Sequence, residues 1–221
     1  CRCNLLEPRF KDSSPSAQVG GLFLTQPAPN KSSLRRELKA HRTAVKPDAR
    51  RTASQRALRL ALRHGLFLRA KRIGFYLPHG AEFDVRPLLN HALWMRRACC
   101  LPVVPARGRV LRFARLNGRN VMTPNRYGIP EPSDPRPLRA RQLDVLFVPL
   151  VGIDDHGFRL GMGGGFYDAT LAYRRRGRAG KKPLLVGVGF ECQRVASLPH
   201  DPWDTPLDAL LTEREFVFFK S

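Results

Sequence analysis

The sequence has few cysteines, few acidic residues and no long apolar run. Its five cysteines among 221 residues form no C-x-x-C pair, and their odd number favours reduced thiols in the cytoplasm over a disulfide framework. No apolar stretch approaches the roughly 20 residues that a transmembrane helix needs. Residues 20–25 are too short for the hydrophobic region of a signal peptide. These absences exclude a disulfide-rich secreted protein and predict no association with a membrane.

Acidic residues are outnumbered, with 18 Asp and Glu against 39 Lys and Arg and a net charge of +21. Such a charge would attract any polyanion. The arginines are spread along the chain, and no nucleic-acid-binding signature or basic platform with interleaved aromatic residues accompanies them. We therefore expect no nucleic-acid partner. The alternative is a basic protein that associates with nucleic acid and performs no chemistry.

The order of apolar and polar segments predicts an α/β fold. Residues 1–30 mix Ser, Pro, Asn and Gly without a period and do not begin with Met, so we expect a disordered extension or residues upstream of the true start. Residues 31–221 are expected to form a single domain, a layered sandwich with a mostly parallel central sheet flanked by helices. Helices are expected at 31–45, 48–64, 84–97 and 165–176, and strands at 71–77, 98–104, 109–115, 143–150, 183–190 and 208–219.

A glycine cluster follows the predicted strand at 143–150, which is nearly all apolar. Gly161, Gly163, Gly164 and Gly165 leave backbone N–H groups bare, and bare N–H groups can surround an anion such as phosphate. The cluster is neither a Walker A motif, because no Lys-Ser/Thr follows it, nor a dinucleotide fingerprint, because its spacing differs. A tight turn without a ligand is the simplest alternative. The flanking Arg159 and Asp168 favour the phosphate interpretation, since they offer a partner for phosphate and one for magnesium.

The longer string around this cluster resembles a known family. Residues 159–168, preceded by Pro-Leu-Val-Gly-Ile-Asp at 149–154, are similar to the signature of the 5-formyltetrahydrofolate cyclo-ligase family. Further stretches match it in order from Lys31 to the end of the chain. The resemblance implies a fold related to sugar-phosphate isomerases and CoA transferases. It also implies a cytoplasmic, monomeric enzyme that uses ATP and Mg²⁺ to cyclise 5-formyltetrahydrofolate, with or without a polyglutamate tail, to 5,10-methenyltetrahydrofolate. ADP and phosphate are released, after phosphorylation of the formyl oxygen and attack by N10.

The same resemblance assigns roles to individual residues. It implies that Arg159 and Asp168 are catalytic, that Leu77, Glu82 and Tyr127 contact the folate, and that Asp168 and Asp208 hold magnesium. The implied ATP-binding residues are Lys31, Ser32, Ser33, Leu34, Arg35, Arg159, Leu160, Gly161, Met162, Gly163, Gly164, Gly165, Phe166 and Tyr167.

This sequence departs from the family at two loop positions. Met162 stands where some members have a basic residue and Gly164 where some have Lys, which leaves the phosphate contacts to backbone N–H groups.

Several of these residues have a simpler interpretation. The basic stripe after residue 30 is also typical of a solvated helix capped by Ser32 or Ser33. Glu82 could be a surface charge, and Tyr127 a packing residue in a proline-rich loop. Asp208 could cap a local turn, in which case Asp201 and Asp204 are the competing magnesium ligands. A relative that kept the fold and changed its substrate is a further alternative.

Overall fold

The computed structural model describes residues 30–118, 121–134, 136–176 and 182–219. The expected disordered extension, residues 1–30, lies outside the described residues except for Asn30. None of the helices in the described part of the chain combines the length and the apolar character that a membrane crossing requires.

The central sheet has seven strands in the order β12-β11-β9-β6-β1-β2-β3. The strands are β1 Arg72–Gly74, β2 Ala98–Val103, β3 Arg112–Arg115, β6 Val145–Pro149, β9 Leu184–Val188, β11 Ala209–Leu211 and β12 Phe216–Phe218. The inner strands β2, β1, β6, β9 and β11 run parallel, and the edge strands β3 and β12 run antiparallel to their neighbours. The predicted mostly parallel α/β sheet is therefore confirmed.

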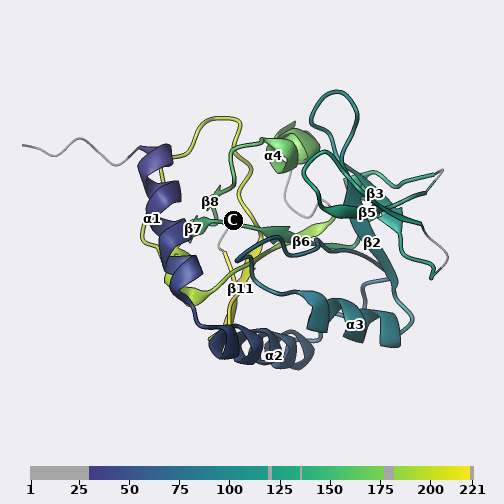
Figure 1. Cartoon of the computed structure of the whole chain (residues 1–221), viewed down its shortest axis with the longest axis horizontal. Helices are drawn as coiled ribbons and strands as arrows, with labels where there is room; N and C mark the ends of the chain where they lie inside the picture. Colours follow the sequence, from purple (N-terminus) through teal and green to yellow (C-terminus); the bar gives the residue numbers. More distant parts are fainter. Residues whose placement is uncertain (1–29, 119–120, 135, 177–181, 220–221) are drawn as a thin grey trace, which may run out of the picture.

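Helices cover both faces of this sheet (Figure 1). Helices α2 (Pro47–Arg63) and α3 (Arg86–Trp94) pack on one face, and α4 (Phe166–Leu171) with the 3-10 turn η2 (Ala172–Arg176) packs on the other. Successive side chains of a strand point to opposite faces. Phe147 of β6 accordingly joins the core under α2 and α3, whereas Leu146 and Val148 join the core under α4.

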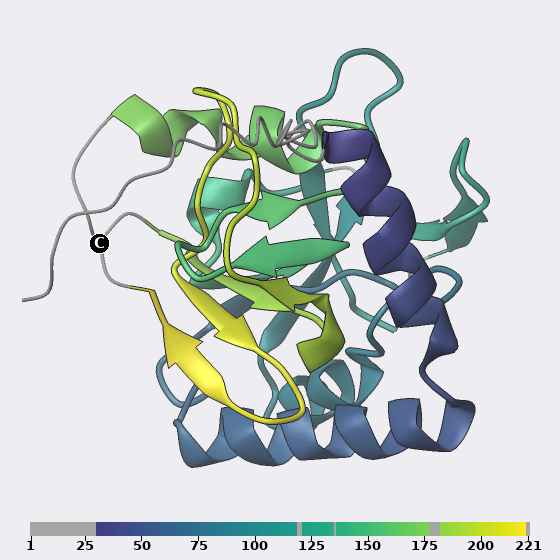
Figure 2. The same ribbon diagram turned by 90° about the vertical axis from the view of Figure 1, so that its left-hand side faces the viewer.

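Helix α1 (Lys31–Ala44) lies across one end of the layers, and its last turn lies near the start of α2 (Figure 2). It packs on a small sheet of β7 (Gly152–Asp154), β8 (Arg159–Leu160) and β10 (Arg194–Val195) through Leu38 and its neighbours. A side chain at Gly152 would collide with Leu38, so glycine allows this close approach. The small sheet carries the chain from the end of β6 into the glycine cluster.

The structure corrects several predicted boundaries. The predicted strand 71–77 is shorter, because only Arg72–Gly74 pair in the sheet and the chain after them leads away toward a loop. The predicted helix 165–176 changes to 3-10 geometry after Leu171. The predicted strand 208–219 is a hairpin of β11 and β12. Strand pairs β4 (Met122–Pro124) with β5 (Pro130–Pro132), and β7 with β8, were not predicted, because segments of two or three residues are too short to show a period.

Candidate active site

A cavity of about 700 Å³ opens at the carboxyl ends of the parallel strands. Its wall includes Pro149 at the end of β6 and Tyr76 and Leu77 just after β1. Open α/β sheets bind ligands at this edge. The cavity is lined by Lys31, Arg35, Tyr76, Leu77, His79, Glu82, Leu101, Pro102, Val104, Arg109, Leu111, Asn125, Tyr127, Ile129, Pro130, Pro149, Leu150, Arg159, Leu160, Gly161, Met162, Gly163, Gly164, Gly165, Phe166, Tyr167, Asp168, Asp201, Trp203 and Asp204.

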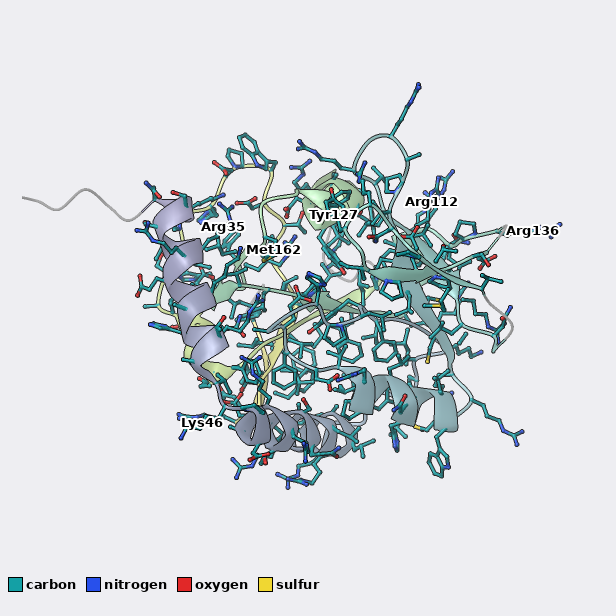
Figure 3. All side chains as sticks on the ribbon, in the orientation of Figure 1. Arg35, Lys46, Arg112, Tyr127, Arg136 and Met162 are labelled. Atoms are coloured by element: carbon teal, nitrogen blue, oxygen red, sulfur yellow. The ribbon has the colours of Figure 1, made fainter. Side chains whose placement is uncertain are left out.

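The glycine cluster forms the rim of one end of this cavity. Gly163 and Gly165 have φ values of 99° and 67°, a region that side chains with a Cβ rarely adopt. Arg35 of α1 reaches across and its Nε donates a hydrogen bond to the Gly161 carbonyl at 2.8 Å. Figure 3 shows Arg35 and Met162 close together at this rim, with Lys46 and Arg136 far out on the surface. A bare backbone with an arginine beside it suits an anionic group.

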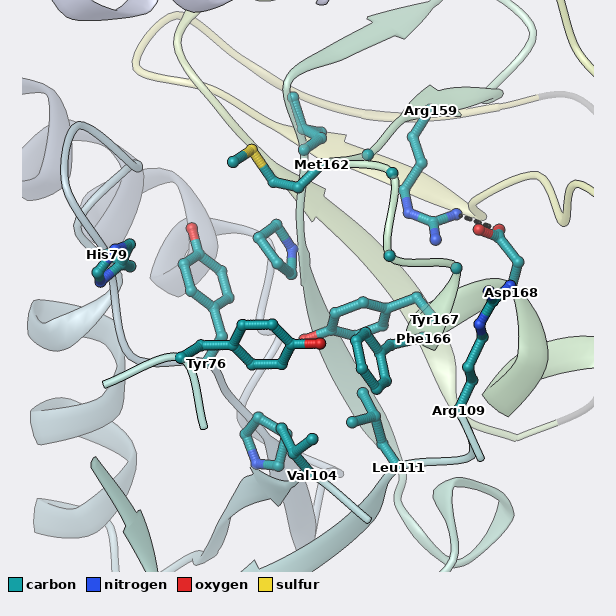
Figure 4. Close-up of a pocket in the computed structure, with 18 of the residues that line it drawn as sticks. Tyr76, His79, Val104, Arg109, Leu111, Arg159, Met162, Phe166, Tyr167 and Asp168 are labelled. Carbon is teal, nitrogen blue, oxygen red and sulfur yellow. Dashed lines mark hydrogen bonds and ion pairs between the residues drawn. The ribbon is translucent and has the colours of Figure 1, made fainter. Parts of the chain in front are cut away.

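Arg159 and Asp168 form an ion pair at the same end. Arg159 Nη1 lies 3.0 Å from Asp168 Oδ1, and the arginine side chain is only 5% exposed (Figure 4). Its Nε is buried and makes no hydrogen bond within the described part of the chain. Its guanidinium also lies 5.7 Å from the ring of Tyr167. The pair therefore fixes a positive charge in the cavity wall with a donor still unused.

Lys31 in the first turn of α1 holds two further carboxylates at the cavity wall. Its Nζ lies 2.5 Å from Asp201 Oδ2 and 2.7 Å from Asp204 Oδ2. Burial alone would raise the pKa of Asp204, but hydrogen bonds from Lys31 and the Asp201 backbone, with the nearby Arg159 charge, hold that pKa below its ordinary value. Asp204 therefore stays ionised.

Another part of the cavity wall, which begins directly after the glycine loop, is apolar and aromatic. Leu77, Val104, Leu111, Tyr127 and Phe166 line it, and Tyr127 meets Phe166 edge to face with ring centres 5.9 Å apart. Figure 4 shows Val104 and Leu111 below Tyr76 and Phe166, around a common space. Such a slot suits a flat, largely apolar ring system.

Glu82 supplies a carboxylate to this cavity. Its Oε2 accepts a hydrogen bond from the His79 backbone at 3.1 Å. Burial raises the pKa of Glu82 above its ordinary value, and the His79 hydrogen bond and the Arg42 charge only partly oppose that rise. Leu77, Glu82 and Tyr127, which the sequence placed at a folate site, thus line one cavity.

Arg50 of α2 holds the loop that carries Glu82. Its guanidinium donates hydrogen bonds to the carbonyls of Ala81 at 2.7 Å and Val45 at 2.7 Å, and also to that of Arg42. The end of α1 and the Glu82 loop are therefore tied to one side chain. No sequence motif marks Arg50, because its partners are backbone carbonyls from separate segments.

The predicted nucleotide-binding residues from Lys31 to Arg35 divide into two groups. Lys31 and Arg35 line the cavity, whereas Ser32, Ser33 and Leu34 do not. The backbone N–H groups of Ser32 and Ser33 bond to Asn30 Oδ1, so Asn30 caps α1 in place of the expected serine. Leu34 packs with the core cluster under α1. These three residues therefore do not belong to the lining of this cavity, and their contact with a nucleotide stays a prediction.

Asp208 does not lie near Asp168, which corrects the predicted magnesium pair. Asp208 precedes β11 at the amino edge of the sheet, where its Oδ2 accepts from Leu185 N at 2.7 Å and its Oδ1 from Arg174 at 2.6 Å. Leu185 pairs in register with Leu146, near the start of β6, while the cavity lies at the other end of that strand. Asp208 therefore has a local structural role, which agrees with the alternative that it caps a turn.

Asp201 and Asp204, the competing candidates, are the carboxylates that the fold brings into the cavity with Asp168. Within the described ranges, no three histidine, cysteine, aspartate or glutamate side chains lie close enough together to form a metal site by themselves. Tyr76 and Arg109 also line the cavity, although the sequence did not single them out as site residues.

One cavity at the carboxyl edge of the parallel sheet thus combines a glycine loop suited to an anion with an apolar slot. These features define the class of the protein: an α/β protein that binds a small-molecule ligand in this cavity. The chain belongs to the 5-formyltetrahydrofolate cyclo-ligase family, whose sequence model matches residues 27–213, and it is an enzyme of that family.

Known relatives and solved structures agree with this membership. The chain is 36% identical to the 5-formyltetrahydrofolate cyclo-ligase of Haemophilus influenzae over 181 residues, which cover 80% of this chain and 92% of the relative. It is 33% identical to the Escherichia coli cyclo-ligase over 180 residues, covering 79% of this chain and 96% of that one. The structure of 5,10-methenyltetrahydrofolate synthetase from Aquifex aeolicus superposes with a TM-score of 0.73 at 29% identity, covering 86% and 93% of the two chains.

Proposed function

We propose that this enzyme uses ATP and Mg²⁺ to cyclise 5-formyltetrahydrofolate to 5,10-methenyltetrahydrofolate, with release of ADP and phosphate. One observation carries the proposal: a single cavity joins the glycine-bordered, arginine-rich end to the apolar slot beside Glu82. The reaction needs a polyanionic nucleotide and a pterin ring to meet in one space. A cavity with one charged end and one apolar end meets that need.

The glycine end is proposed to hold the nucleotide phosphates. Its backbone N–H groups, Arg35 and Arg159 face one rim of the cavity, so phosphate oxygens there would find several donors. Lys31 adds an ammonium group beside them. The cations would offset phosphate charge during transfer, which is the main task of a protein in phosphoryl-transfer chemistry.

The apolar end is proposed to hold the folate. The pterin would lie among Leu77, Tyr127 and Phe166, and Glu82 would accept hydrogen bonds from its amino-pyrimidine edge. The raised pKa of Glu82 is consistent with a buried carboxylate that a hydrogen-bonding ligand would contact in the slot.

The proposed chemistry has two steps. First, the formyl oxygen attacks the γ-phosphorus. An O–P bond forms, the bond to the bridging oxygen breaks, and its electron pair leaves with ADP. Second, the N10 lone pair attacks the formyl carbon, the C–O bond breaks, and phosphate leaves with that pair while N10 loses its proton. No protein nucleophile is required, so the residues orient two substrates and stabilise charge.

Asp168 and Asp204 are proposed to hold the magnesium ion, in place of the expected Asp168 and Asp208. Both are carboxylates in the cavity wall beside the proposed phosphate end, and Mg²⁺ commonly uses one or two carboxylates together with substrate phosphates. Bound there, the ion would neutralise part of the phosphate charge. We further propose that the enzyme acts as a monomer in the cytoplasm, where its odd number of cysteines would stay reduced.

The test is a spectrophotometric assay of purified protein. 5-Formyltetrahydrofolate and Mg-ATP are mixed with the enzyme, and the methenyltetrahydrofolate absorbance band is followed, with a control that lacks ATP. An ATP-dependent rise supports the proposal. A flat trace from folded protein that binds ATP would overturn it and point to a different acceptor for the phosphoryl group.

A further inference from the structure

Arg109 approaches the glycine loop from a part of the chain that no motif marks. It lies in the segment between β2 and β3, about 50 residues before the loop, and it lines the same cavity. A Cβ placed on Gly165 would lie 3.4 Å from Arg109 Nη1 and 3.7 Å from its Cδ. Figure 4 shows its side chain reaching up toward the end of the loop and Asp168.

Arg109 differs from the other cations near the loop because none of the residues that the structure describes pairs with it. Arg35 is bonded to Gly161, Arg159 to Asp168, and Lys31 to two aspartates. Among the described residues, by contrast, Arg109 donates no hydrogen bond and forms no ion pair, and its side chain is exposed. It can therefore move onto a ligand without breaking a contact of the folded protein.

The loop itself offers no cation at its centre, where Met162 is followed by three glycines. We propose that Arg109 binds the terminal phosphoryl group of the nucleotide and supplies the positive charge that the loop lacks. This inference rests on the proposed function. As the formyl oxygen forms its bond to phosphorus and the bond to ADP breaks, negative charge gathers on the phosphoryl and bridging oxygens. A guanidinium placed there stabilises that charge.

Another ligand for Arg109 would be a carboxylate of the folate tail. The position of Arg109 beside Gly165 argues against it, because the loop belongs to the proposed nucleotide end of the cavity. Arg126 stands nearer the folate slot and already packs over the rings of Tyr127 and Phe166, 5.3 and 5.6 Å from their centres. The two ligands make different kinetic predictions.

The experiment compares Arg109→Gln and Arg109→Lys with the control Arg107→Gln, an exposed neighbour that does not line the cavity. We expect Arg109→Gln to lower kcat/KM for ATP by about 100-fold, since removing one charge-stabilising donor costs roughly 10²–10³-fold in rate. Arg109→Lys should recover part of the loss, and Arg107→Gln should match the wild type. The KM for 5-formyltetrahydrofolate should stay within about twofold. A raised folate KM with unchanged kcat/KM for ATP would overturn the inference.

Calorimetry separates this inference from the proposed function. The affinities of a non-hydrolysable ATP analogue and of ADP are measured for the wild type and Arg109→Gln. We expect the variant to lose affinity for the analogue by about tenfold while ADP affinity changes less than about threefold. Equal losses for both nucleotides, or none, would overturn the role of Arg109 even if the wild type cyclised no folate. An inactive wild type with the expected binding pattern would overturn only the choice of acceptor.

Discussion

Two arginine–aspartate ion pairs lie at opposite edges of the same parallel sheet. Arg159 and Asp168 meet at 3.0 Å at the carboxyl edge, and Arg174 and Asp208 meet at 2.6 Å at the amino edge. The aspartate side chains are almost equally exposed, at 26% and 30%. Exposure and pairing therefore do not distinguish the two carboxylates.

The difference lies in how the remaining polar atoms are used. Both oxygens of Asp208 accept protein hydrogen bonds, one from Arg174 and one from Leu185 N. Among the residues that the structure describes, Asp168 accepts one, from Arg159, and the Nε of that arginine has no partner. This pair faces a cavity. A satisfied pair stabilises the fold, whereas a pair with unused hydrogen-bonding capacity at a cavity is free to act on a ligand.

Asp168→Asn should produce the largest change, a loss of at least about 10³-fold in kcat with little loss of stability, since charge stabilisation at a reacting centre is worth that much. The amide oxygen of Asn can still accept from Arg159, so the contact within the protein survives. Steady-state assays with thermal unfolding of the same sample measure both effects. Normal turnover at saturating magnesium would show that Asp168 is not a metal ligand.

Glu82→Gln should raise the KM for 5-formyltetrahydrofolate by about 10–100-fold, because a hydrogen bond to a charged group contributes roughly 1.5–3 kcal/mol. The KM for ATP should stay near that of the wild type, since Glu82 lies with the folate slot. Kinetics with each substrate varied in turn test the division of the cavity into two ends. Equal changes in both KM values would contradict it.

Asp208→Asn should lower the free energy of unfolding by about 1–2 kcal/mol, because an Asn side chain has one acceptor where Asp208 uses two. Its kcat should remain within about twofold of the wild type. Chemical denaturation and the absorbance assay together make it the matched control for Asp168→Asn. A large loss of kcat without a loss of stability would return Asp208 to the active site.

The smallest expected effect is a dependence of stability on pH. Burial raises the pKa of Glu82 in the folded state, so its ionised form costs stability above that pKa. The cost disappears as the pH falls through the folded-state pKa toward the unfolded value. The Tm of Glu82→Gln minus that of the wild type should therefore be more positive at pH 8 than at pH 5. A difference that does not vary with pH would show that Glu82 titrates normally.

Features confined to one stretch of chain were predictable from sequence. The strand, glycine loop and helix that carry Arg159 and Asp168 lie within residues 145–171, and the structure places them together as expected. The parallel sheet followed from apolar runs that alternate with helical segments. Hairpin β4–β5 was not predicted, because all three residues of β4 are exposed and give no periodic signal.

The choice among distant carboxylates could not be made in the same way. Asp201, Asp204 and Asp208 lie within eight positions of one another, yet two face the cavity and the third lies at the far edge of the sheet. The serines after Asn30 looked suitable for a nucleotide but bond to the cap of α1. In each case the role of the residue depends on a tertiary or backbone contact that the spacing of residues in the sequence does not reveal.

The sequence alone thus specified the glycine-loop motif and the main helices and strands, because turns, helix caps and apolar periods depend on residues that are neighbours in the chain. The composition of the cavity came from folding. Parallel strands bring their carboxyl ends to one edge, so Lys31, Glu82, Arg109 and Asp204, from four separate segments, surround one space. Whether a given charge is satisfied or left available there depends on partners far away in sequence, and packing alone selects those partners.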